Sequence, residues 1–440
     1  MQKDEKLLDK IVSLAKRRGF VFQGSEIYGG FAGMWDYGPY GVALKNNIKN
    51  LWWKMFVDAR DDVWGIDAAI LMPARVWDAS GHTGAGFTDP LVECAECKKR
   101  FRADHLEDKK KCPECGGMLG EERQFNLMFE TRVGALEDSS AVSYLRPETA
   151  QGIFVNFKNV VDSVHPKLPF GIAQVGKAFR NEITPRDFIF RIRELEQMEI
   201  EYFVKPTDWE RVFEEWREAT GKWIDALGID RAHVREVEIG DGDRAHYSKR
   251  TIDFEYEYPF GTKELSGLAY RTDYDLSNHT KHSGQDLGYF DEETKERLVP
   301  HVIEPSFGVE RALLAVLCDA YREEEVNGET RVYLKLPTRL APVKVMVSPL
   351  LKNKPELVAK AREVREAVRK VIPETAWDDN GNVGKRYRRQ DEIGTPYCVT
   401  VDFDSLEKGD VTVRDRDTME QVRVPISDLP TYLKEKIEAK

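Results

Sequence analysis

The clearest pattern in the chain is an alternation of polar and apolar residues that runs up to Glu199. One side of the strand predicted over residues 188–199 carries Arg191, Arg193, Leu195, Gln197 and Glu199, and the other carries Phe190 and Ile192 and continues with Met198 and Ile200. A period of two is typical of a strand with one face in the core. The opposite face would then carry two arginines and a glutamate.

A second apolar run, over residues 170–179, precedes this strand and ends in Arg180, Asn181 and Glu182. Pro185 and Asp187 lie between the two runs and are turn residues, so the pattern predicts an antiparallel hairpin. The hairpin would place Arg180 beside the two arginines of the strand and form a cationic platform edged by carboxylates. The alternative is a solvated sheet face whose charges form ion pairs.

A helix is predicted to begin near Gly308, because apolar residues recur at helical spacing at Val309, Leu313, Val316 and Leu317. Arg311 falls in its first turn, where the helix dipole disfavours a cation. An arginine at this place is explained if an anion also binds there, and a nucleoside triphosphate would satisfy both. The alternative is a local ion pair with Glu310 or Glu304.

The remaining patterns divide the chain into a long first part and a shorter last part. The first part has predicted helices over 5–18, 42–60 and 209–227, a glycine-rich loop over 29–41 and a strand over 63–73. The tryptophans of the third helix are interpreted as core residues. Beyond 336–342 the chain alternates between strands and helices, at 343–347, 357–371, 397–403 and 411–424. This alternation predicts a separate α/β domain of about 100 residues.

The cysteines fall into two groups. Four of them form two Cys-x2-Cys pairs with the spacing of a zinc ribbon: Cys94, Cys97, Cys112 and Cys115. Four thiolates leave no open coordination position, so such a zinc ion would be structural. Disulfides are the alternative, although the chain shows no secretion signal. Cys318 and Cys398 lie in apolar runs and are predicted to be buried thiols.

Composition narrows the class of protein without identifying it. The chain has 440 residues, of which 41% are hydrophobic and 32% charged, as in ordinary globular proteins of two or three domains. No apolar run reaches the roughly 20 residues that span a bilayer, and the first residues are polar, so we expect a cytoplasmic protein without a membrane segment.

The net charge of −11 excludes a surface that attracts nucleic acid everywhere. The acidic excess lies before Thr338, and the remainder is nearly balanced. A nucleic acid would therefore have to meet a local basic patch. The densest one contains Lys385, Arg386, Arg388 and Arg389, with Tyr387 available to stack on a base. The alternative is a solvated charged turn.

Several of these stretches resemble one family. Phe179-Arg-Asn-Glu182 with the strand through Glu199 resembles the second signature of class II aminoacyl-tRNA synthetases, and Gly308-Val-Glu-Arg311 resembles the third. Within that class the chain is similar to the dimeric glycyl-tRNA synthetases in the stretches 28–30 with 35–39, 146–152, 304–306 and 384–394. The resemblance covers about residues 11–425 and keeps the order of the family's motifs.

The resemblance implies an α+β fold, with a class II antiparallel sheet flanked by helices. A catalytic domain would span 1–336, with a zinc-ribbon insertion at about 92–122 and a helical or mixed insertion at about 205–260. An α/β anticodon-binding domain would span 337–440. The helix over 42–60 and the proline-ended strand after it would form the first signature at a dimer interface, so we expect a homodimer.

The resemblance also implies a reaction, the ATP-dependent joining of glycine to tRNA(Gly) through glycyl-adenylate. The residues implied to bind ATP with Mg²⁺ are Arg180, Asn181, Glu182, Phe190, Arg191, Arg193, Leu195, Glu264, Leu265, Gly308, Glu310 and Arg311. Within this set Arg180 and Arg311 would be catalytic and Glu264 would contact Mg²⁺. Arginine suits both roles because it donates bidentate hydrogen bonds and stacks on rings.

The implied glycine site consists of Arg102, Glu148, Leu195, Gln197, Glu199, Arg271, Glu304 and Ser306. Glycine offers no side chain to hold, so larger amino acids have to be excluded by the walls of the pocket. Clustered carboxylates suit an ammonium group, and their mutual repulsion should raise the pKa of at least one. Lys385, Arg386, Arg388 and Arg389 are implied to contact tRNA.

Two other hypotheses stay open at this point. A related enzyme could activate a different small amino acid or pass the adenylate to an acceptor other than tRNA. An accessory subunit could keep the fold and bind nucleic acid without catalysis, but it would be expected to lose the arginines, and Arg180, Arg193 and Arg311 are all present.

Overall fold

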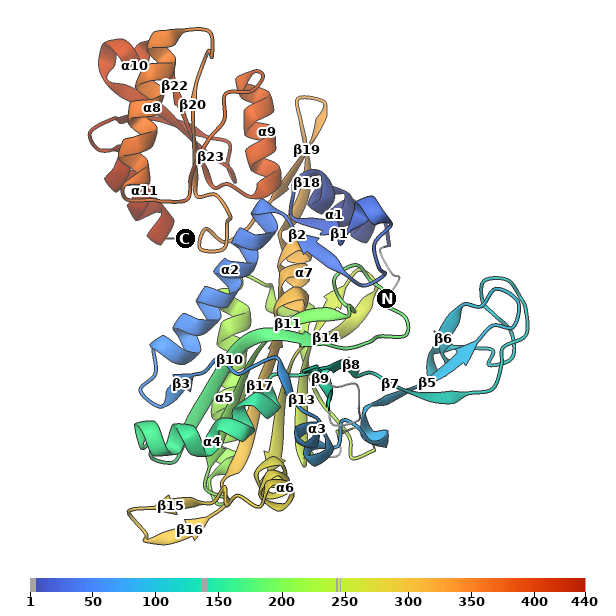
Figure 1. Ribbon diagram of the computed structural model, residues 1–440. Coiled ribbons are helices and arrows are strands. Elements are labelled where there is room, and N and C mark those ends of the chain that lie inside the picture. Colours follow the sequence, from blue (N-terminus) through green and yellow to red (C-terminus); the bar gives the residue numbers. More distant parts are fainter. Residues whose placement is uncertain (1–4, 136–140, 243, 246, 440) are drawn as a thin grey trace.

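The computed structural model describes residues 5–135, 141–242, 244–245 and 247–439. The polar residues at the start of the chain, from which we expect no signal peptide, lie largely outside these ranges. The centre of the molecule is a seven-stranded sheet (Figure 1), antiparallel except for its last pair. In spatial order its strands are β12 (Val234–Glu238), β13 (Arg250–Tyr258), β14 (Gly261–Thr272), β17 (His301–Gly308), β11 (Glu194–Val204), β10 (Phe170–Phe179) and β3 (Val63–Gly65).

The two faces of β11 separate the core from the pocket. Its even-numbered residues, such as Met198 and Ile200, belong to a large apolar core with helices α2 (Pro39–Trp53), α5 (Trp209–Ala226) and α7 (Val309–Ala320). Its odd-numbered residues from Leu195 to Glu199 face a cavity. Beyond that cavity Phe203 packs with helix α4 (Ala150–Val164) and Leu276 of α6 (Tyr274–Ser283) in a second core.

The predicted hairpin is confirmed, but its second strand is shorter than the alternation indicated. β10 and β11 pair over their full facing length, and β11 begins only at Glu194. Asp187 and Phe188 have positive φ angles, and Arg186 and Arg191 form an isolated bridge, so residues 180–193 fold into a loop of their own. The prediction of a strand over 188–193 is therefore wrong, and the loop changes which way Phe190 points.

Other boundaries also differ from the predictions. The strand predicted over 63–73 is in fact two strands in different sheets, β3 and β4 (Leu71–Pro73). The glycine-rich stretch contains β2 (Trp35–Tyr37), which pairs with β1 (Val21–Gln23), and the start of α2, whose last turn continues as a wider π-helix, Lys54–Asp58. The helix predicted at the start is α1 (Glu5–Arg17).

The segment over 205–260 contributes to the central sheet. It supplies α5, in which Trp216 and Trp223 are buried core residues as predicted, and then β12 and β13.

The cysteine-containing segment projects from the molecule (Figure 1) as β5 (Thr88–Glu93), β6 (Arg100–Arg102) and β7 (Arg123–Asn126). A small sheet of β4, β8 (Phe129–Arg132) and β9 (Val142–Leu145), with α3 (Ala74–Ser80), lies at its base. Two hairpins, β15 (Tyr289–Asp291) with β16 (Glu296–Leu298) and β18 (Tyr321–Val326) with β19 (Glu329–Leu334), complete this part.

The last part of the chain forms the predicted α/β unit. Its five-stranded sheet has the order β21 (Thr375–Trp377), β20 (Val345–Pro349), β22 (Tyr397–Val401), β23 (Asp410–Asp415) and β24 (Gln421–Pro425). The helices are α8 (Pro355–Arg369), α9 (Val383–Ile393), α10 (Phe403–Lys408) and α11 (Leu429–Glu438). The basic cluster lies on α9, so it is not the charged turn that was the alternative prediction.

Within the described ranges, none of the helices is both long and apolar enough to cross a membrane.

Candidate active site

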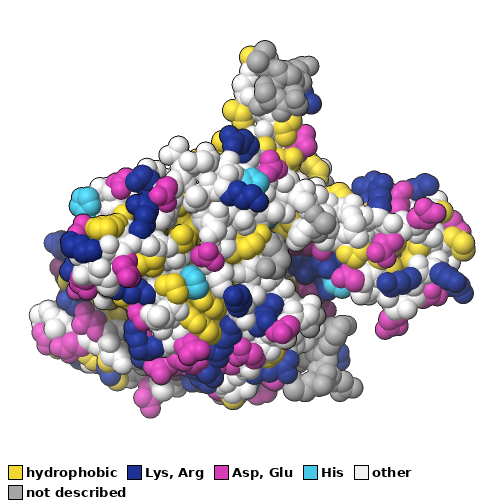
Figure 2. Space-filling view, turned by 90° about the horizontal axis from the view of Figure 1, so that it is seen from below, with side chains coloured by type: hydrophobic (Ala, Val, Ile, Leu, Met, Phe, Trp, Pro, Cys, Tyr) yellow, Lys and Arg dark blue, Asp and Glu magenta, His cyan; other side chains and the backbone are white. Residues whose placement is uncertain are grey.

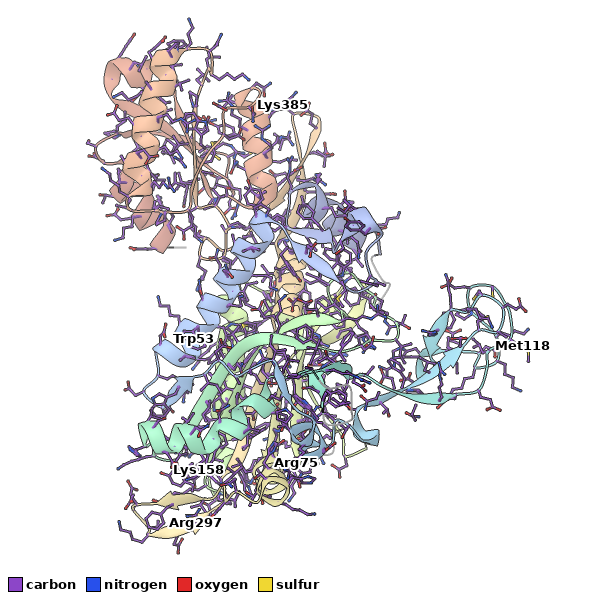
Figure 3. The ribbon with its side chains drawn as sticks, in the orientation of Figure 1. Trp53, Arg75, Met118, Lys158, Arg297 and Lys385 are labelled. Carbon is purple, nitrogen blue, oxygen red and sulfur yellow. The ribbon has the colours of Figure 1, made fainter. Side chains whose placement is uncertain are left out.

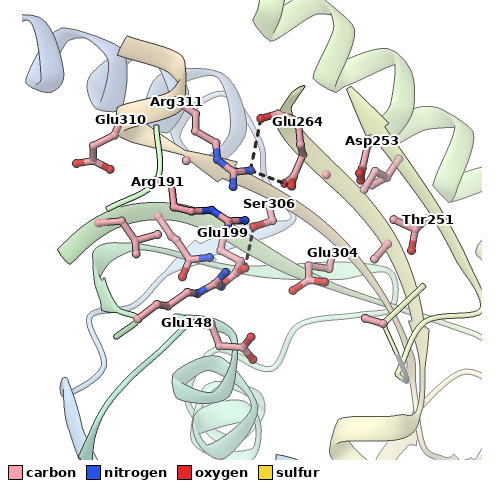
Figure 4. Close-up of a pocket in the computed structure, with 18 of the residues that line it drawn as sticks. Glu148, Arg191, Glu199, Thr251, Asp253, Glu264, Glu304, Ser306, Glu310 and Arg311 are labelled. Atoms are coloured by element: carbon pink, nitrogen blue, oxygen red, sulfur yellow. Dashed lines mark hydrogen bonds and ion pairs between the residues drawn. The ribbon is translucent and has the colours of Figure 1, made fainter. Parts of the chain in front are cut away.

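The largest concentration of predicted functional residues lines one cavity of about 380 Å³. Residues of β11, β14, β17, the first turn of α7 and the 180–193 loop line it, and Figure 4 shows some of their side chains. The predicted residues that line it are Glu148, Arg180, Glu182, Phe190, Arg191, Leu195, Gln197, Glu199, Glu264, Glu304, Ser306, Gly308, Glu310 and Arg311.

One end of the cavity is built around Arg311. The helix begins at Val309 with Gly308 as its N-cap, as predicted, so Arg311 lies in the first turn. Its guanidinium lies over the ring of Phe190, 4.8 Å from the centroid, and its Nη1 is 2.9 Å from Oε2 of Glu264 (Figure 4). Arg311 lowers the pKa of Glu264. Phe190 reaches the cavity because the loop, rather than a strand, sets its direction.

Two further arginines face the same end. Arg180 donates from Nε to the carbonyl of Pro147 at 2.9 Å, which fixes its direction and leaves its terminal nitrogens for other partners. Arg191 has its Nη1 3.7 Å from Glu182 Oε2, too long for a hydrogen bond, and both atoms lie buried without a partner among the described residues. Burial lowers the pKa of Arg191. Unpaired buried donors of this kind fit a site for an anion.

The opposite end of the cavity is acidic, and both carboxylate oxygens of Glu199 at this end accept hydrogen bonds. This side chain accepts a hydrogen bond from Ser306 Oγ at 2.9 Å (Figure 4). It accepts another from Thr149 Oγ1 at 2.5 Å. Glu148 accepts from Gln151 at 3.0 Å and lies 3.3 Å from His82 Nε2. Glu304 Oε1 accepts from Arg271 Nη1 at 2.8 Å.

The acidic groups differ in how readily they ionise. Burial and the neighbouring carboxylates raise the pKa of Glu304 to about 8. Burial and the charge of Glu148 raise the pKa of Glu199. Burial opposes ionisation of Glu148 as well, but His82 and Arg271 outweigh it and hold its pKa below the usual range. The cluster therefore keeps some protons at neutral pH until a cation enters.

Arg271 is held just below the acidic end. The register of β14 against β17 shifts between Tyr270 and Thr272, so Arg271 is the extra residue of a β-bulge. Its guanidinium donates to Glu304 and, at 2.8 and 2.9 Å, to Asp275 of α6. It also stacks on the ring of Tyr247, 3.7 Å from the centroid. The arginine therefore orients Glu304 from beneath.

Four other predicted residues do not line the cavity. Asn181 donates its backbone N–H to Leu127, and Leu265 is a buried core residue. Arg193 donates to the carbonyls of Ala32 and Glu182, which ties the glycine-rich loop to the 180–193 loop. Arg102 is paired with Asp89 and Asp104 and lies nearer to Glu182 and Arg191 than to the acidic end.

The structure adds residues that the sequence patterns did not reveal. They are His82, Thr149, Gln151, Glu201, Tyr247, Asp253 and Asp275. Glu201 continues the alternation of β11 by one step and could have been found from it. The others come from separate segments and meet only in the fold. Burial, Glu264 and Glu255 raise the pKa of Asp253, which lines the cavity, to about 7.

The four cysteines of the projecting segment come together. Sγ of Cys94 is 3.5 Å from Sγ of Cys115, and Sγ of Cys97 is 3.7 Å from Sγ of Cys112. All four are free thiols and form one cluster of potential metal ligands, so the disulfide alternative is wrong. A tetrahedral zinc ion with Zn–S bonds of 2.3 Å separates its sulfurs by about 3.8 Å, which this cluster matches. Cys318 and Cys398 are buried, as predicted.

The basic cluster of α9 divides into inward and outward residues. Arg386 is 1% exposed and donates to the carbonyls of Asp379 and Gly381, at 3.1 and 2.8 Å, and to that of Pro349. Arg389 pairs with Asp378, and Arg388 donates to the Thr330 carbonyl. Lys385 lies exposed in the first turn of α9 (Figure 3). On the face shown in Figure 2, acidic and basic side chains intermingle.

This arrangement can gather two ligands of opposite charge. Three arginines at one end can receive a polyanion, and the carboxylates at the other end can receive an ammonium group. Both ends open into one cavity, so a ligand with a carboxylate and an ammonium group could place its carboxylate against a phosphate. The site thus suits phosphoryl or nucleotidyl transfer to a small zwitterion.

Comparison with known proteins agrees with this chemistry. Residues 134–320 match the tRNA synthetase class II core domain (G, H, P, S and T), and residues 344–436 match the anticodon binding domain. A glycine–tRNA ligase of Clostridium acetobutylicum is 53% identical, over 99% of this chain and 100% of its own. One of Caldanaerobacter subterraneus subsp. tengcongensis is 52% identical, over 98% of each chain, and one of Streptomyces coelicolor is 53% identical, over 97% of each.

Proposed function

The chain belongs to the glycine–tRNA ligases with a class II synthetase core and an anticodon-binding domain, and we propose that the cavity described above carries both substrates of the first step. In that step the carboxylate of glycine attacks the α-phosphorus of ATP and pyrophosphate leaves. The nucleophile is already ionised, so the protein's task is to position the substrates and to stabilise negative charge.

The arginine end is assigned to ATP. Arg180 binds the α-phosphate, and Arg311 binds the γ-phosphate and stacks on the adenine. Glu182 accepts a hydrogen bond from the adenine amino group. The nitrogen of Arg191 that has no hydrogen-bond partner in the part of the chain that the structure describes supports a phosphate contact there as well. Mg²⁺ at phosphates is commonly held by one or two carboxylates. Glu264 supplies one carboxylate, and Asp253 lies close to it on the other side of Gly267. A Cβ atom placed at Gly267 would lie 3.8 Å from Asp253 Oδ1 and 3.9 Å from Glu264 Oε1.

The acidic end is assigned to glycine. Glu148, Glu199, Glu304 and Ser306 surround the ammonium group and the α-carbon, and Arg271 orients Glu304. The observation that carries this assignment is the placement of buried carboxylates beside the arginines in one cavity of about 380 Å³. Side chains larger than hydrogen would have to displace groups that already hydrogen-bond one another, which supports selection of glycine by exclusion.

Amino-acid-dependent exchange of labelled pyrophosphate into ATP tests the assignment. Purified protein should exchange with glycine and at least about 100-fold more slowly with alanine or serine, because the walls exclude both. The same preparation should then charge tRNA(Gly). Exchange driven equally well by alanine or serine would refute the glycine pocket. Exchange with glycine but no charging of tRNA would indicate another acceptor.

The other parts of the molecule support further assignments. We assign residues 1–336 to catalysis and 337–440 to anticodon binding, with Lys385, Arg388 and Arg389 contacting tRNA. The cysteine cluster fits a structural zinc ion, and metal analysis should find one per chain. We expect a homodimer in the cytoplasm. Ile27 and Tyr28, each 88% exposed, and Phe31 precede α2 and offer apolar surface for a second copy.

A further inference from the structure

One buried carboxyl group near the glycine end has no role in the scheme above. Glu201 follows Glu199 by two residues on β11, so its side chain projects from the same face. Glu199 pairs with Ser306 and Tyr202 pairs with Ile303, and this register places Glu201 directly opposite Glu304. The side chain of Glu201 is 0% exposed. It therefore lies one step deeper than the groups assigned to glycine.

The hydrogen bonds of its neighbours are already accounted for. Both oxygens of Glu199 accept hydrogen bonds from hydroxyl groups, and Glu304 Oε1 accepts one from Arg271. Neither oxygen of Glu201 has a hydrogen-bond partner among the described residues. One carboxylate oxygen from each of Glu199, Glu201 and Glu304 lies within 4.8 Å of the other two.

The charges that face Glu201 are mostly negative. Glu199 on its own strand, Glu304 on β17 and Asp275 on α6 oppose its ionisation, and Arg271 on β14 favours it. Glu148 and the ring of Tyr247 border the same cluster. Arg271 already donates to Asp275 and Glu304. A fully buried carboxylate without a partner is very costly, whereas a neutral carboxylic acid is not. Burial and Glu304 indeed raise the pKa of Glu201 well above its usual value.

We propose that Glu201 is an uncharged carboxylic acid in the working enzyme and that its hydroxyl group donates to Glu304, forming the floor of the glycine pocket. The inference deepens the proposed function, on which it rests. When glycine binds, the shared proton leaves Glu304 as the anion of the pair, held between Arg271 and Glu201 and directed at the ammonium group. Glu201 is thus a positioning residue that keeps the pocket matched to one positive charge.

A metal ion between the three carboxylates is the competing explanation. Mg²⁺ prefers six oxygen ligands in octahedral geometry and retains several waters. Here the two oxygens of Glu199 and one of Glu304 are already occupied by hydrogen-bond donors, and a guanidinium lies at Glu304. The free oxygens suit a proton better than a cation.

Glu201→Gln tests the proposal because an amide is neutral, nearly isosteric and still a donor. Its KM for glycine should stay within about threefold of the wild type, whereas Glu201→Leu, which has no donor, should raise it about tenfold. Glu218→Gln, at an exposed position of α5, is the matched control. A large loss in Glu201→Gln would refute the neutral form, and so would a metal ion that binds the wild type but not this variant.

Infrared difference spectra give a readout that a merely structural role would not move. At pH 7 the difference spectrum of the wild type minus Glu201→Gln should show the carbonyl band of a protonated carboxylic acid, and that of the wild type minus Glu218→Gln should not. Identical spectra would overturn the proposal. If Glu201→Gln does not fold, wild-type protein labelled with ¹³C at the glutamate carboxyl carbons should still show a buried acid resonance at pH 7 with saturating glycine, which leaves Glu304 ionised, and its absence would overturn the proposal. The band reports Glu201 whichever amino acid drives pyrophosphate exchange, so a failure of the proposed function would be seen separately.

Discussion

The arginines of the central cavity and those of the C-terminal domain have opposite surroundings. In the cavity, Arg191 has a buried nitrogen without a hydrogen-bond partner among the described residues, and Arg311 is paired with Glu264. In the C-terminal domain, Arg414 donates to Asp391, which also accepts from Arg331 of β19, and Arg386 donates to three backbone carbonyls. The residue type is the same, but only the first group keeps donors for a ligand.

The difference shows how to separate binding from structure in a chain rich in arginine. A guanidinium carries five N–H donors, and those left unpaired in a buried place have to be satisfied by something else. Donors already used inside the fold contribute to stability, and removing them leaves acceptors unpaired. We therefore expect substitutions of the cavity arginines to lower activity and substitutions of the internal arginines to lower stability.

Replacing Arg311 by alanine should abolish activity without destabilising the fold. The loss of one positioned cation at developing negative charge should lower glycine-dependent pyrophosphate exchange about 10²–10³-fold. Arg311→Lys should recover only part of it, because lysine cannot donate in a bidentate manner or stack in the same way. Arg211→Ala, at an exposed site of α5, is the control. Normal exchange in Arg311→Ala would remove its assigned role.

Replacing Arg386 should have the opposite effect, because it should destabilise the fold and leave activity unchanged. Arg386→Met removes donors from the carbonyls of Pro349, Asp379 and Gly381, so the free energy of unfolding should fall by about 2–4 kcal/mol. Pyrophosphate exchange per folded molecule should not change, because the cavity lies in the other part of the chain. Denaturant unfolding measures the free energy of unfolding, and the pyrophosphate-exchange assay measures activity. Unchanged stability together with lost tRNA binding would place Arg386 in the tRNA site instead.

The pH dependence of the two substrates should differ. The raised pKa of Glu304, about 8, means that this group takes up a proton as the pH falls below 8. Glycine's ammonium group must then compete with that proton, so KM for glycine should rise by up to tenfold per pH unit between pH 8 and 6. KM for ATP should change much less, because guanidinium groups stay protonated throughout. A flat profile for glycine would show that Glu304 is ionised before glycine binds.

The same comparison explains what the sequence could and could not predict. The hairpin of β10 and β11, the helix start at Gly308 and the cysteine cluster follow from local periodicity or spacing, and the structure confirms them. The path of the 180–193 loop does not, because it depends on two positive φ angles and on carbonyls of the distant glycine-rich loop. Asp275 and His82 come from separate segments that only the tertiary fold brings to Gln151 and Glu148.

The basic cluster of α9 shows the same limit, because four neighbouring cations of one helix cannot all face outward. Periodicity places Arg386 on the buried side and Lys385 on the exposed side, but local charge alone does not distinguish them. Only contacts with β20 and the 378–381 segment show that Arg386 is an internal donor.

Lys385 should therefore give the smallest and most specific effect. As an exposed cation in the first turn of α9, it can contact a phosphate without serving the fold. Lys385→Ala should weaken tRNA binding and lower the slope of log affinity against log salt concentration by about one, with pyrophosphate exchange and stability unchanged. Lys370→Ala, an exposed lysine that follows α8, is the control. If both variants bind tRNA with the wild-type salt dependence, α9 does not face the tRNA backbone at Lys385, and the outward arginines Arg388 and Arg389 lose their assignment with it.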